Sequence, residues 1–174
     1  MIIQDKGNIE SIQNFFKKNW KIKHILAKNS KIFKWLHYNP FEKKYNFLLF
    51  KRKNKTLGFL GIIKNSKFSN GLNNFDTVWL TTWVAKKTEL GVGALLLMHS
   101  IKHYKYSKIG TIGCSEEAKI IYKKMRFKVG NMKHHFVINP KINSFKLIKI
   151  TKNKKKISFN EQLHKKIKYL KGDL

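Results

Sequence analysis

Cysteine, proline and acidic residues are scarce in this sequence. Cys114 is the only cysteine, so an internal disulfide framework is excluded and a cysteine-based metal cluster is not expected. No apolar run reaches the roughly 18 to 20 residues that span a bilayer. The first residues also lack the basic-then-apolar layout of a signal peptide. We therefore expect a cytoplasmic protein without membrane insertion.

The 9 acidic residues stand against 38 lysines and arginines, which gives a formal charge of +29. Such a charge suggests a polyanionic partner, either nucleic acid or an anionic membrane surface. However, only Arg52 and Arg126 are arginines, whereas proteins that read phosphates or guanines favour the planar arginine fork. The lysines accompany many Asn, Ile and Phe residues, a composition that A/T-rich coding produces in proteins of any function. We expect a solvated lysine surface that favours small anionic ligands, and we do not expect nucleic acid as a partner.

The chain has 174 residues, of which 42% are hydrophobic, and is long enough for one domain with a substantial core. We place this domain at residues 1–151. Residues 152–174 are dense in lysine with few apolar positions, which predicts a partly helical tail. There is no internal repeat and no linker rich in Gly, Ser or Pro.

Apolar spacing predicts the order of helices and strands. The predicted helices are Ile9–Trp20, Ile22–Leu36, Ala94–Tyr106 and Glu116–Met125. The predicted strands are Met1–Gln4, Tyr45–Phe50, Thr56–Ile63, Asp76–Ala85, Ser107–Gly113, Phe127–Ile138 and Ser144–Ile150. A turn at Lys53–Lys55 joins the second and third strands into a hairpin. This order predicts an α/β (α+β) fold, with a central sheet of mixed direction and helices on both faces.

The loop before the third predicted helix contains Gly91 and Gly93. A strand, a Gly-x-Gly loop and a helix place free backbone N–H groups and the positive end of a helix dipole at one point, which suits a phosphate. Glycines chosen for a tight turn and close packing explain the loop equally well. A Rossmann motif is disfavoured because its third glycine would fall at Leu96, and the G-x-x-x-x-G-K-[ST] pattern is absent.

A second motif follows one helix and one strand later, where Ser115 and Ala118 open a helix that carries Tyr122. Thr88-Glu-Leu-Gly91-Val-Gly93 and Ser115-Glu-Glu-Ala118-Lys-Ile-Ile-Tyr122-Lys-Lys-Met-Arg126-Phe127 together resemble the acetyl-CoA-binding half of the GNAT family of N-acetyltransferases. That family has [Arg/Gln]-x-x-Gly-x-[Gly/Ala] and then Asn-x-x-Ala-x-x-x-Tyr-x-x-x-Gly-Phe. The resemblance covers roughly residues 1–151 and implies a mostly antiparallel sheet with one splayed pair of parallel strands.

Three positions depart from the family motifs: Thr88 for Arg or Gln, Ser115 for Asn, and Arg126 for Gly. Thr88 removes a side-chain contact but leaves the backbone N–H groups, so binding of acetyl-CoA is still expected. Arg126 is tolerated at the turn if its φ angle is negative.

By this resemblance, acetyl-CoA is the acetyl donor and binds between the strands Thr77–Ala85 and Lys108–Gly113. The pantetheine arm is expected along the backbone of Thr82, Trp83 and Val84. The diphosphate is expected on the amides of Leu90, Gly91, Val92, Gly93 and Ala94. Thr88, Ser115, Ala118 and Tyr122 complete the implied binding set. A primary amine then attacks the thioester directly, with both substrates bound, and an N–H near Trp83 or Val84 stabilises the oxyanion.

Tyr122 is the expected general acid toward the departing thiolate, with a core tyrosine at helical spacing as the alternative. The amine needs a base, and the strand Trp79–Ala85 lacks the acidic residue that often serves in the family. The candidates are Asp76, His37, His134 and His135, of which we favour His134. A structural or surface histidine is the alternative for each of the three histidines. Cys114 is not expected to act as a nucleophile, because no histidine neighbours it in the sequence.

Within the family, the chain looks most like acetyltransferases of bacterial surface-polysaccharide biosynthesis that act on nucleotide-linked amino sugars. The segments that suggest this are Phe16–Trp20, Ile32–Pro40, Trp79–Trp83 and Lys133–Asn139. Trp20, Trp35, Trp79 and Trp83 fit a core as a set, although one or two could stack on a sugar or a base. Two other functions stay open, namely a basic nucleic-acid or anionic-surface binding module, and a GNAT-like protein that binds CoA without catalysis. A monomer and a homodimer are both compatible with the sequence.

Overall fold

The computed structural model describes residues 1–4, 8–72, 77–104 and 108–132. Contacts divide the chain into two units, Met1–Lys128 and Val129–Leu174, and the description below concerns the first. Residues 127–132 form no strand, so that part of the strand predicted at Phe127–Ile138 is wrong. The rest of that strand, the strand Ser144–Ile150, the boundary at residue 151 and the tail lie outside the described residues.

The first unit contains a five-stranded sheet with the strand order β1-β4-β5-β6-β7. These strands are β1 (Ile2–Ile3), β4 (Phe47–Arg52), β5 (Lys55–Lys64), β6 (Thr77–Ala85) and β7 (Lys108–Thr111). Neighbours in the sheet are antiparallel except β6 and β7, which are parallel. A short separate ladder joins β2 (Tyr38–Asn39) to β3 (Lys44–Tyr45). The predicted sheet of mixed, mostly antiparallel direction is confirmed.

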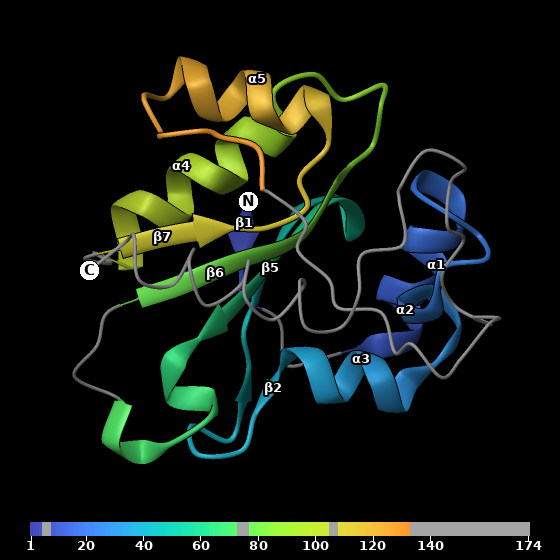
Figure 1. The fold of residues 1–174 in the computed structure, drawn as a ribbon. Helices are drawn as coiled ribbons and strands as arrows, with labels where there is room; N and C mark the ends of the chain where they lie inside the picture. The colour runs from blue at the N-terminus through green and yellow to red at the C-terminus, as the bar shows by residue number, and fades with distance from the viewer. Residues whose placement is uncertain (5–7, 73–76, 105–107, 133–174) are drawn as a thin grey trace, which may run out of the picture. The chain divides into compact units, whose positions relative to one another are not determined.

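Helices cover both faces of this sheet (Figure 1). One face carries α1 (Ile9–Asn19), α2 (Ile25–Lys28) and α3 (Ser30–His37), and the other carries α4 (Val92–Tyr104) and α5 (Glu116–Lys124). The 3-10 turns η1 (Asn65–Lys67) and η2 (Asn70–Leu72) follow β5. No helix in the described part of the chain is long and apolar enough to cross a membrane.

The single helix predicted at Ile22–Leu36 is wrong, because α2 and α3 are separate helices. Asn29 lies between them with φ −109° and ψ 107°, outside the helical region. Its side-chain oxygen accepts a hydrogen bond from the Ile32 N–H at 3.0 Å and so caps α3. An asparagine that offers an N-cap interrupts a helical pattern that apolar spacing alone reads as continuous.

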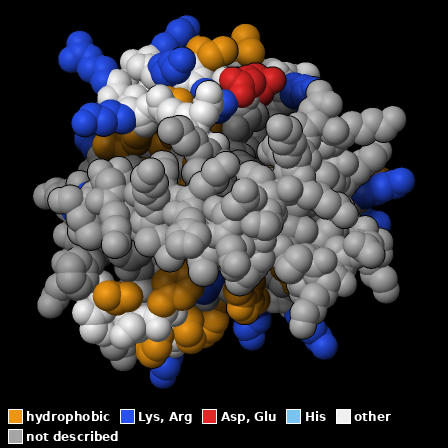
Figure 2. Space-filling model, in the orientation of Figure 1, with side chains coloured by type: hydrophobic (Ala, Val, Ile, Leu, Met, Phe, Trp, Pro, Cys, Tyr) orange, Lys and Arg blue, Asp and Glu red, His pale blue; other side chains and the backbone are white. Residues whose placement is uncertain are grey.

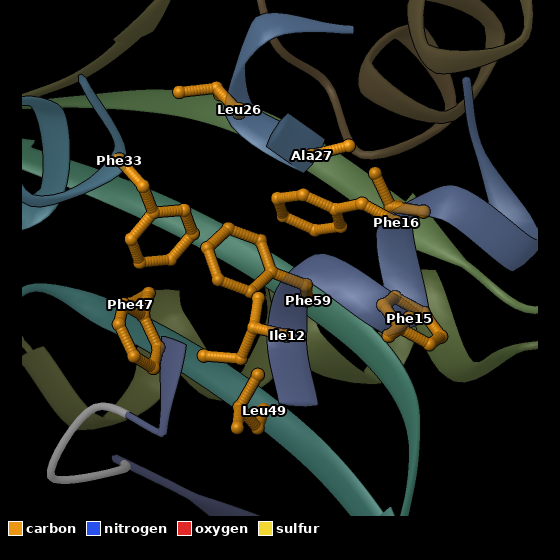
Figure 3. Packing of buried hydrophobic residues seen from close by; sticks show 10 residues of the cluster. Ile12, Phe15, Phe16, Leu26, Ala27, Phe33, Phe47, Leu49 and Phe59 are labelled. Atoms are coloured by element: carbon orange, nitrogen blue, oxygen red, sulfur yellow. The ribbon is translucent and has the colours of Figure 1, made fainter. Parts of the chain in front are cut away.

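Phenylalanine rings form the core between the sheet and the helices α1 to α3 (Figure 3). The rings of Phe16 on α1 and Phe33 on α3 lie 4.9 and 6.1 Å from the ring of Phe59 on β5, and all three are fully buried. Val84 of β6 belongs to the same cluster. The core therefore fixes which side of β6 faces α1 to α3.

Helix α4 packs closely on the other face of the sheet through Gly58 of β5. A Cβ at Gly58 would lie 2.6 Å from Cγ1 of Val92 and 2.8 Å from Cδ1 of Leu96. Since no side chain larger than hydrogen fits there, the first turns of α4 rest on the backbone of β5. This contact positions the start of α4 next to the end of β6.

His37, at the end of α3, is 1% exposed and lies among the rings of Phe33, Phe47 and Phe59. Neither of its ring nitrogens has a hydrogen-bond partner within the described part of the chain. Burial lowers the pKa of His37 to about 3, with a smaller contribution from the charge of Lys67. His37 is therefore neutral and shielded from solvent, which argues against it as the general base.

We expect this burial to make the protein sensitive to acid. The unfolded chain protonates His37 below its ordinary pKa of 6.5, whereas the folded protein does so only near pH 3. Between these values the unfolded state binds more protons than the folded state. The free energy of unfolding therefore decreases as the pH is lowered, by about 2 to 3 kcal/mol from pH 7.5 to 4.5. Urea unfolding at pH 7.5 and 4.5 measures this decrease in the free energy of unfolding. The decrease should be smaller by about 2 to 3 kcal/mol in His37→Leu than in the unmodified protein. Equal losses in the two proteins would contradict the assignment.

Candidate functional site

The strands β6 and β7 pair only along their first part, from Thr77 with Lys108 to Leu80 with Thr111. β7 ends at Thr111, whereas β6 continues to Ala85. Among the described residues, this last part of β6 has no partner strand on the β7 side. The parallel pair is thus open beyond Leu80, as the splayed pair predicted from the motifs requires.

A β-bulge at Thr82 interrupts the pairing of β6 with β5. Trp83 pairs with Leu60, but the next pair joins Thr81 to Gly61, so Thr82 is left without a counterpart. Its φ angle is +43°, which is rare for a β-branched residue and costs about 1 to 3 kcal/mol. Strain of this kind persists only where the surrounding structure imposes it, and it is common at functional sites.

The bulge changes which way the side chains of β6 point. A Cβ at Gly61 would lie 2.9 Å from Cγ2 of Thr81, on the face that α3 covers. Trp83 faces the other way, and its Nε1–H donates to the Gly93 carbonyl of α4 at 3.2 Å. Val84 returns to the first face, in the phenylalanine core. Trp83 therefore ties the end of β6 to the start of α4.

The hydrogen bonds between β5 and β6 determine which backbone groups are free at the open edge. The Lys86 N–H donates to the Leu57 carbonyl at 2.8 Å. Because an antiparallel ladder alternates, the backbone groups of Val84 also point to β5, and those of Trp83 and Ala85 point to the open edge. The backbone N–H and carbonyl of Val84, which we expected to be free for the pantetheine arm, therefore point to β5 instead. Ala85 was missed, because its free groups depend on the register between β5 and β6.

Glycine is required for a different reason at each of the two positions in the loop before α4. Gly91 has a φ angle of +81° and nothing within 4 Å of where a Cβ would be, so its backbone conformation is what requires glycine. A Cβ at Gly93 would lie 3.2 Å from Nε1 of Trp83, so its small size makes room for the indole ring. The tight turn and the close packing are both present.

The start of α4 presents free backbone donors. The Leu95 N–H makes the first helical hydrogen bond, to the Gly91 carbonyl at 2.9 Å, and the Val92 N–H reaches the Glu89 carbonyl only at 3.5 Å. Within the described residues, four N–H groups here have no acceptor, namely those of Leu90, Gly91, Gly93 and Ala94. The dipole of this 13-residue helix adds positive potential. The arrangement suits anionic oxygens.

A guanidinium lies beside this loop, although it does not come from the motif. Thr88, where the family has Arg or Gln, is exposed. Arg52 at the end of β4 reaches the loop instead, with Nη1 3.0 Å from Oε2 of Glu89. The pair neutralises the carboxylate nearest to the free N–H groups. Sequence reasoning missed Arg52 because its contact depends on the pairing of β4 with β5.

The side chain of Ser115 is used for capping helix α5. Its Oγ accepts a hydrogen bond from the Ala118 N–H at 3.3 Å, which satisfies a donor in the first turn. Ala118 itself is half-buried. Serine thus keeps the capping function that asparagine, the family residue, would also provide.

Tyr122 is 3% exposed and lies on α5, with its ring centroid 5.5 Å from that of Trp83 and 5.3 Å from that of Phe127. Burial raises the pKa of Tyr122 to about 12, a hydrogen bond with Thr111 acts in the opposite direction, and Cys114 adds a smaller increase. The Thr111 hydroxyl donates its proton to the Leu80 carbonyl at 3.0 Å, and its oxygen lies beside the phenol of Tyr122. The phenol is therefore protonated and held at the last paired residues of β6 and β7.

Arg126 ends helix α5 in the left-handed region, with a φ angle of +63°. Its N–H donates to the Lys123 carbonyl at 2.9 Å, and the Phe127 N–H donates to the Tyr122 carbonyl at 3.0 Å. These two bonds form a Schellman motif, in which glycine is preferred at the position of Arg126. The condition of a negative φ is not met, so this departure from the family motif strains the backbone. The ring contact between Tyr122 and Phe127 completes the motif.

The remaining candidates are only partly placed. Asp76, His134 and His135 lie outside the described residues. Cys114 is free and half-exposed. The described residues contain no cluster of three or more His, Cys, Asp or Glu side chains that could hold a metal. The free edge of β6, the donors of α4 and the phenol of Tyr122 are thus what the structure brings together.

A scan against models of known protein families finds no match, and a search of curated proteins finds none either. Solved structures, in contrast, match the fold. The ribosomal-protein-S18-alanine N-acetyltransferase from Escherichia coli aligns with a TM-score of 0.58 and 11% identity, over 80% of this chain and 84% of that one. A GNAT-family acetyltransferase from Streptococcus pneumoniae aligns with a TM-score of 0.52 and 11% identity, over 81% and 98%.

A protein from Pyrococcus horikoshii aligns with a TM-score of 0.54 and 16% identity, over 74% of this chain but only 43% of that one. At these identities the likeness shows the fold alone. The chain has the fold of the GNAT acetyltransferases, the family that its two motifs resemble.

We expect Arg126→Gly to stabilise the protein by about 0.5 to 1 kcal/mol, because glycine removes the cost of the left-handed conformation and loses only part of that gain to its greater freedom when unfolded. Urea or thermal unfolding measures this change. Lys123→Gly in the same helix is the matched control and should destabilise by about 1 kcal/mol. A loss of stability in Arg126→Gly would contradict the assigned strain.

Proposed function

We propose that this chain is an acetyl-CoA-dependent N-acetyltransferase that moves an acetyl group to a primary amine by direct attack. The observation that carries the proposal is a coincidence at one place. Within the described residues, a free edge of β6, a set of unpaired amides at α4 and a buried, protonated phenol all lie where the parallel strands separate. Each matches one chemical need of this reaction, and the fold is that of known acetyltransferases.

The start of α4 would hold the diphosphate of acetyl-CoA by backbone groups. Leu90, Gly91, Gly93 and Ala94 supply N–H donors, and Val92 supplies the weakly bonded one. Arg52 beside the loop neutralises Glu89, so that this carboxylate does not repel the diphosphate next to Thr88. Ser115 and Ala118 shape the start of α5 near Lys87, whose charge acts on Glu117. When bound, acetyl-CoA supplies the activated acetyl group as a thioester.

Trp83 would bind the pantetheine arm and the oxyanion. Its backbone N–H points to the open edge, whereas that of Val84 points to β5, so the direction of the ladder favours Trp83. A fixed N–H donor at a developing oxyanion contributes about 3 to 4 kcal/mol to lowering a barrier of this type. Thr82 contributes by producing the bulge that orients Trp83.

Tyr122 would stabilise the departing sulfur mainly as a hydrogen-bond donor. An ordinary thiol has a pKa near 8.5, so complete proton transfer from a phenol with a pKa of about 12 would cost about 5 kcal/mol. The high pKa guarantees a donor O–H at every physiological pH, and Thr111 holds that group at the strand ends. The acceptor nitrogen attacks the carbonyl carbon, the carbon–sulfur bond breaks, and the proton that the amine gives up finally protonates the thiolate.

For the base that takes this proton we keep His134, the candidate that we favour from the sequence. For the acceptor, we propose a nucleotide-linked amino sugar in the cytoplasm, as in surface-polysaccharide biosynthesis. The excess of positive charge, +29, supports an anionic acceptor because it raises the local concentration of such ligands.

The proposal is tested by thiol release from acetyl-CoA with a panel of amines: nucleotide-linked amino sugars, free amino sugars, amino acids, polyamines and peptides. We expect release with at least one amine and binding of CoA by calorimetry. Failure to bind CoA at millimolar concentration would refute the proposal. Binding of CoA without turnover on any amine would indicate a CoA-binding protein without catalysis.

We expect Tyr122→Phe to lower kcat by about 100-fold, because it removes the donor and keeps the ring. The affinity for CoA should not change, since Phe preserves the contacts with Trp83 and Phe127. Tyr45→Phe on β3, whose ring packs on Tyr38 and Phe47, serves as the control and should keep full activity with a simple amine. An unchanged kcat in Tyr122→Phe would assign this residue to packing alone.

A further inference from the structure

A cavity of about 550 Å³ lies between α3, the end of β5 and the turn η1. Its lining combines three aromatic rings with three lysines: Trp35, Tyr38, Phe68, Lys31, Lys34 and Lys67. No acidic side chain of the described residues lines it. Figure 2 shows hydrophobic side chains gathered along the lower edge of the molecule with lysines projecting among them, in the region of α3 and η1 in Figure 1.

Two of the rings are unusually accessible for their size. Trp35 is 72% exposed and Phe68 is 66% exposed, although burial of such rings is normally a large source of stability. Exposed aromatic faces beside a cavity can recover this free energy by stacking on a planar ligand. Pockets of 300 to 1,000 Å³ accommodate ligands of that size.

Lys67 holds Trp35 in place despite its exposure. Its Nζ donates to the carbonyl oxygens of Trp35 and Leu36, at 2.6 Å for the latter, and lies 5.4 Å from the centroid of the indole ring. The ammonium thus binds the C-terminal carbonyls of α3, where the helix dipole favours a cation. The backbone that carries Trp35 is thus held in place, and the ammonium contacts one face of the ring.

The exposed lining is mainly apolar, and the lysine charges beside it favour an anion. The Nζ of Lys34 lies 5.4 Å from the centroid of Tyr38, so lysine charges stand beside the rings. Glu42, the nearby carboxylate, is occupied by Lys44 at 3.0 Å, Lys64 at 3.1 Å and Ser66 at 2.8 Å. Lys67 is partly buried, which lowers its pKa, and a bound anion would offset that loss of solvation.

The cavity also lies within reach of the open edge of β6. Ile63, which lines it, pairs with Trp79, and Trp79 precedes Trp83 by four positions in β6. At 3.3 Å per residue this separation is about 10 to 13 Å along β6, and the step from Ile63 across to Trp79 adds about 5 Å. The ribose, the pyrophosphate and one sugar ring of a nucleotide-linked sugar together bridge a distance of this order.

We propose that this cavity binds the nucleoside diphosphate part of the acceptor, with the base stacked on Trp35 and Phe68 and the phosphates at Lys31 and Lys34. This inference rests on the proposed function and names the acceptor class through a separate subsite. It directs the sugar amine toward the edge of β6.

The test uses UDP and dTDP as probes, with uridine and inorganic pyrophosphate as partial ligands, on the full chain. We expect the diphosphates to bind at least tenfold more tightly than either partial ligand and to quench tryptophan fluorescence. Trp35→Ala should weaken binding at least tenfold and Trp35→Phe should largely retain it. Lys31→Gln with Lys34→Gln should weaken binding, whereas Lys17→Gln with Lys18→Gln on α1, which removes the same charge, should not.

Affinity for CoA should be unchanged in Trp35→Ala, as should turnover of a simple amine without a nucleotide, whereas the KM for a nucleotide-linked amino sugar should rise at least tenfold. No binding of UDP or dTDP by a chain that binds CoA and acetylates amines would overturn the inference and leave the proposed function standing. Failure to bind both the nucleoside diphosphates and CoA would overturn the inference and the proposed function together. Displacement of UDP by CoA would show that UDP binds at the α4 loop. Much tighter binding of oligouridine than of UDP would show that the surface binds single-stranded nucleic acid. Either result would overturn the inference.

Discussion

The β-bulge at Thr82 is the constraint on which the arrangement of the candidate site depends. One extra residue in β6 allows Val84 to enter the phenylalanine core while Trp83, its neighbour, faces α4 and α5. Without the bulge, the strict alternation of a strand would send Thr81 and Trp83 to the same face. The positive φ of Thr82 is the local cost of this arrangement.

Trp83 links three parts of the site because of that bulge. Its indole lies against Gly93, donates to the Gly93 carbonyl and contacts the ring of Tyr122, while its backbone groups point to the open edge. The amides of α4 and the phenol of α5 are therefore positioned by the same side chain. A change in the register of β6 would displace both at once.

Backbone groups carry most of the chemistry that we assign here. The amides at the start of α4 and the N–H of Trp83 need no particular side chain, which explains how the motif tolerates Thr88 and Ser115. Arg126 is different, because its left-handed conformation imposes strain that glycine would avoid. Tyr122 is the side chain of the described residues to which we assign a chemical role, and its environment of Thr111, Trp83 and Phe127 is largely apolar.

The sequence by itself determined most of the order of elements and the hairpin, because these follow from apolar periodicity and from local turn chemistry. The parallel pair and the placing of Gly91, Gly93 and Tyr122 at one site came from the resemblance of the two motifs to the GNAT family. The sequence did not determine the break at Asn29, because a cap competes with a continuous helical pattern there. It also did not determine the free backbone of Ala85, the reach of Arg52 or the burial of His37. Those depend on strand register and on which rings meet across the core, and only the tertiary structure decides such contacts because residues far apart in the chain make them.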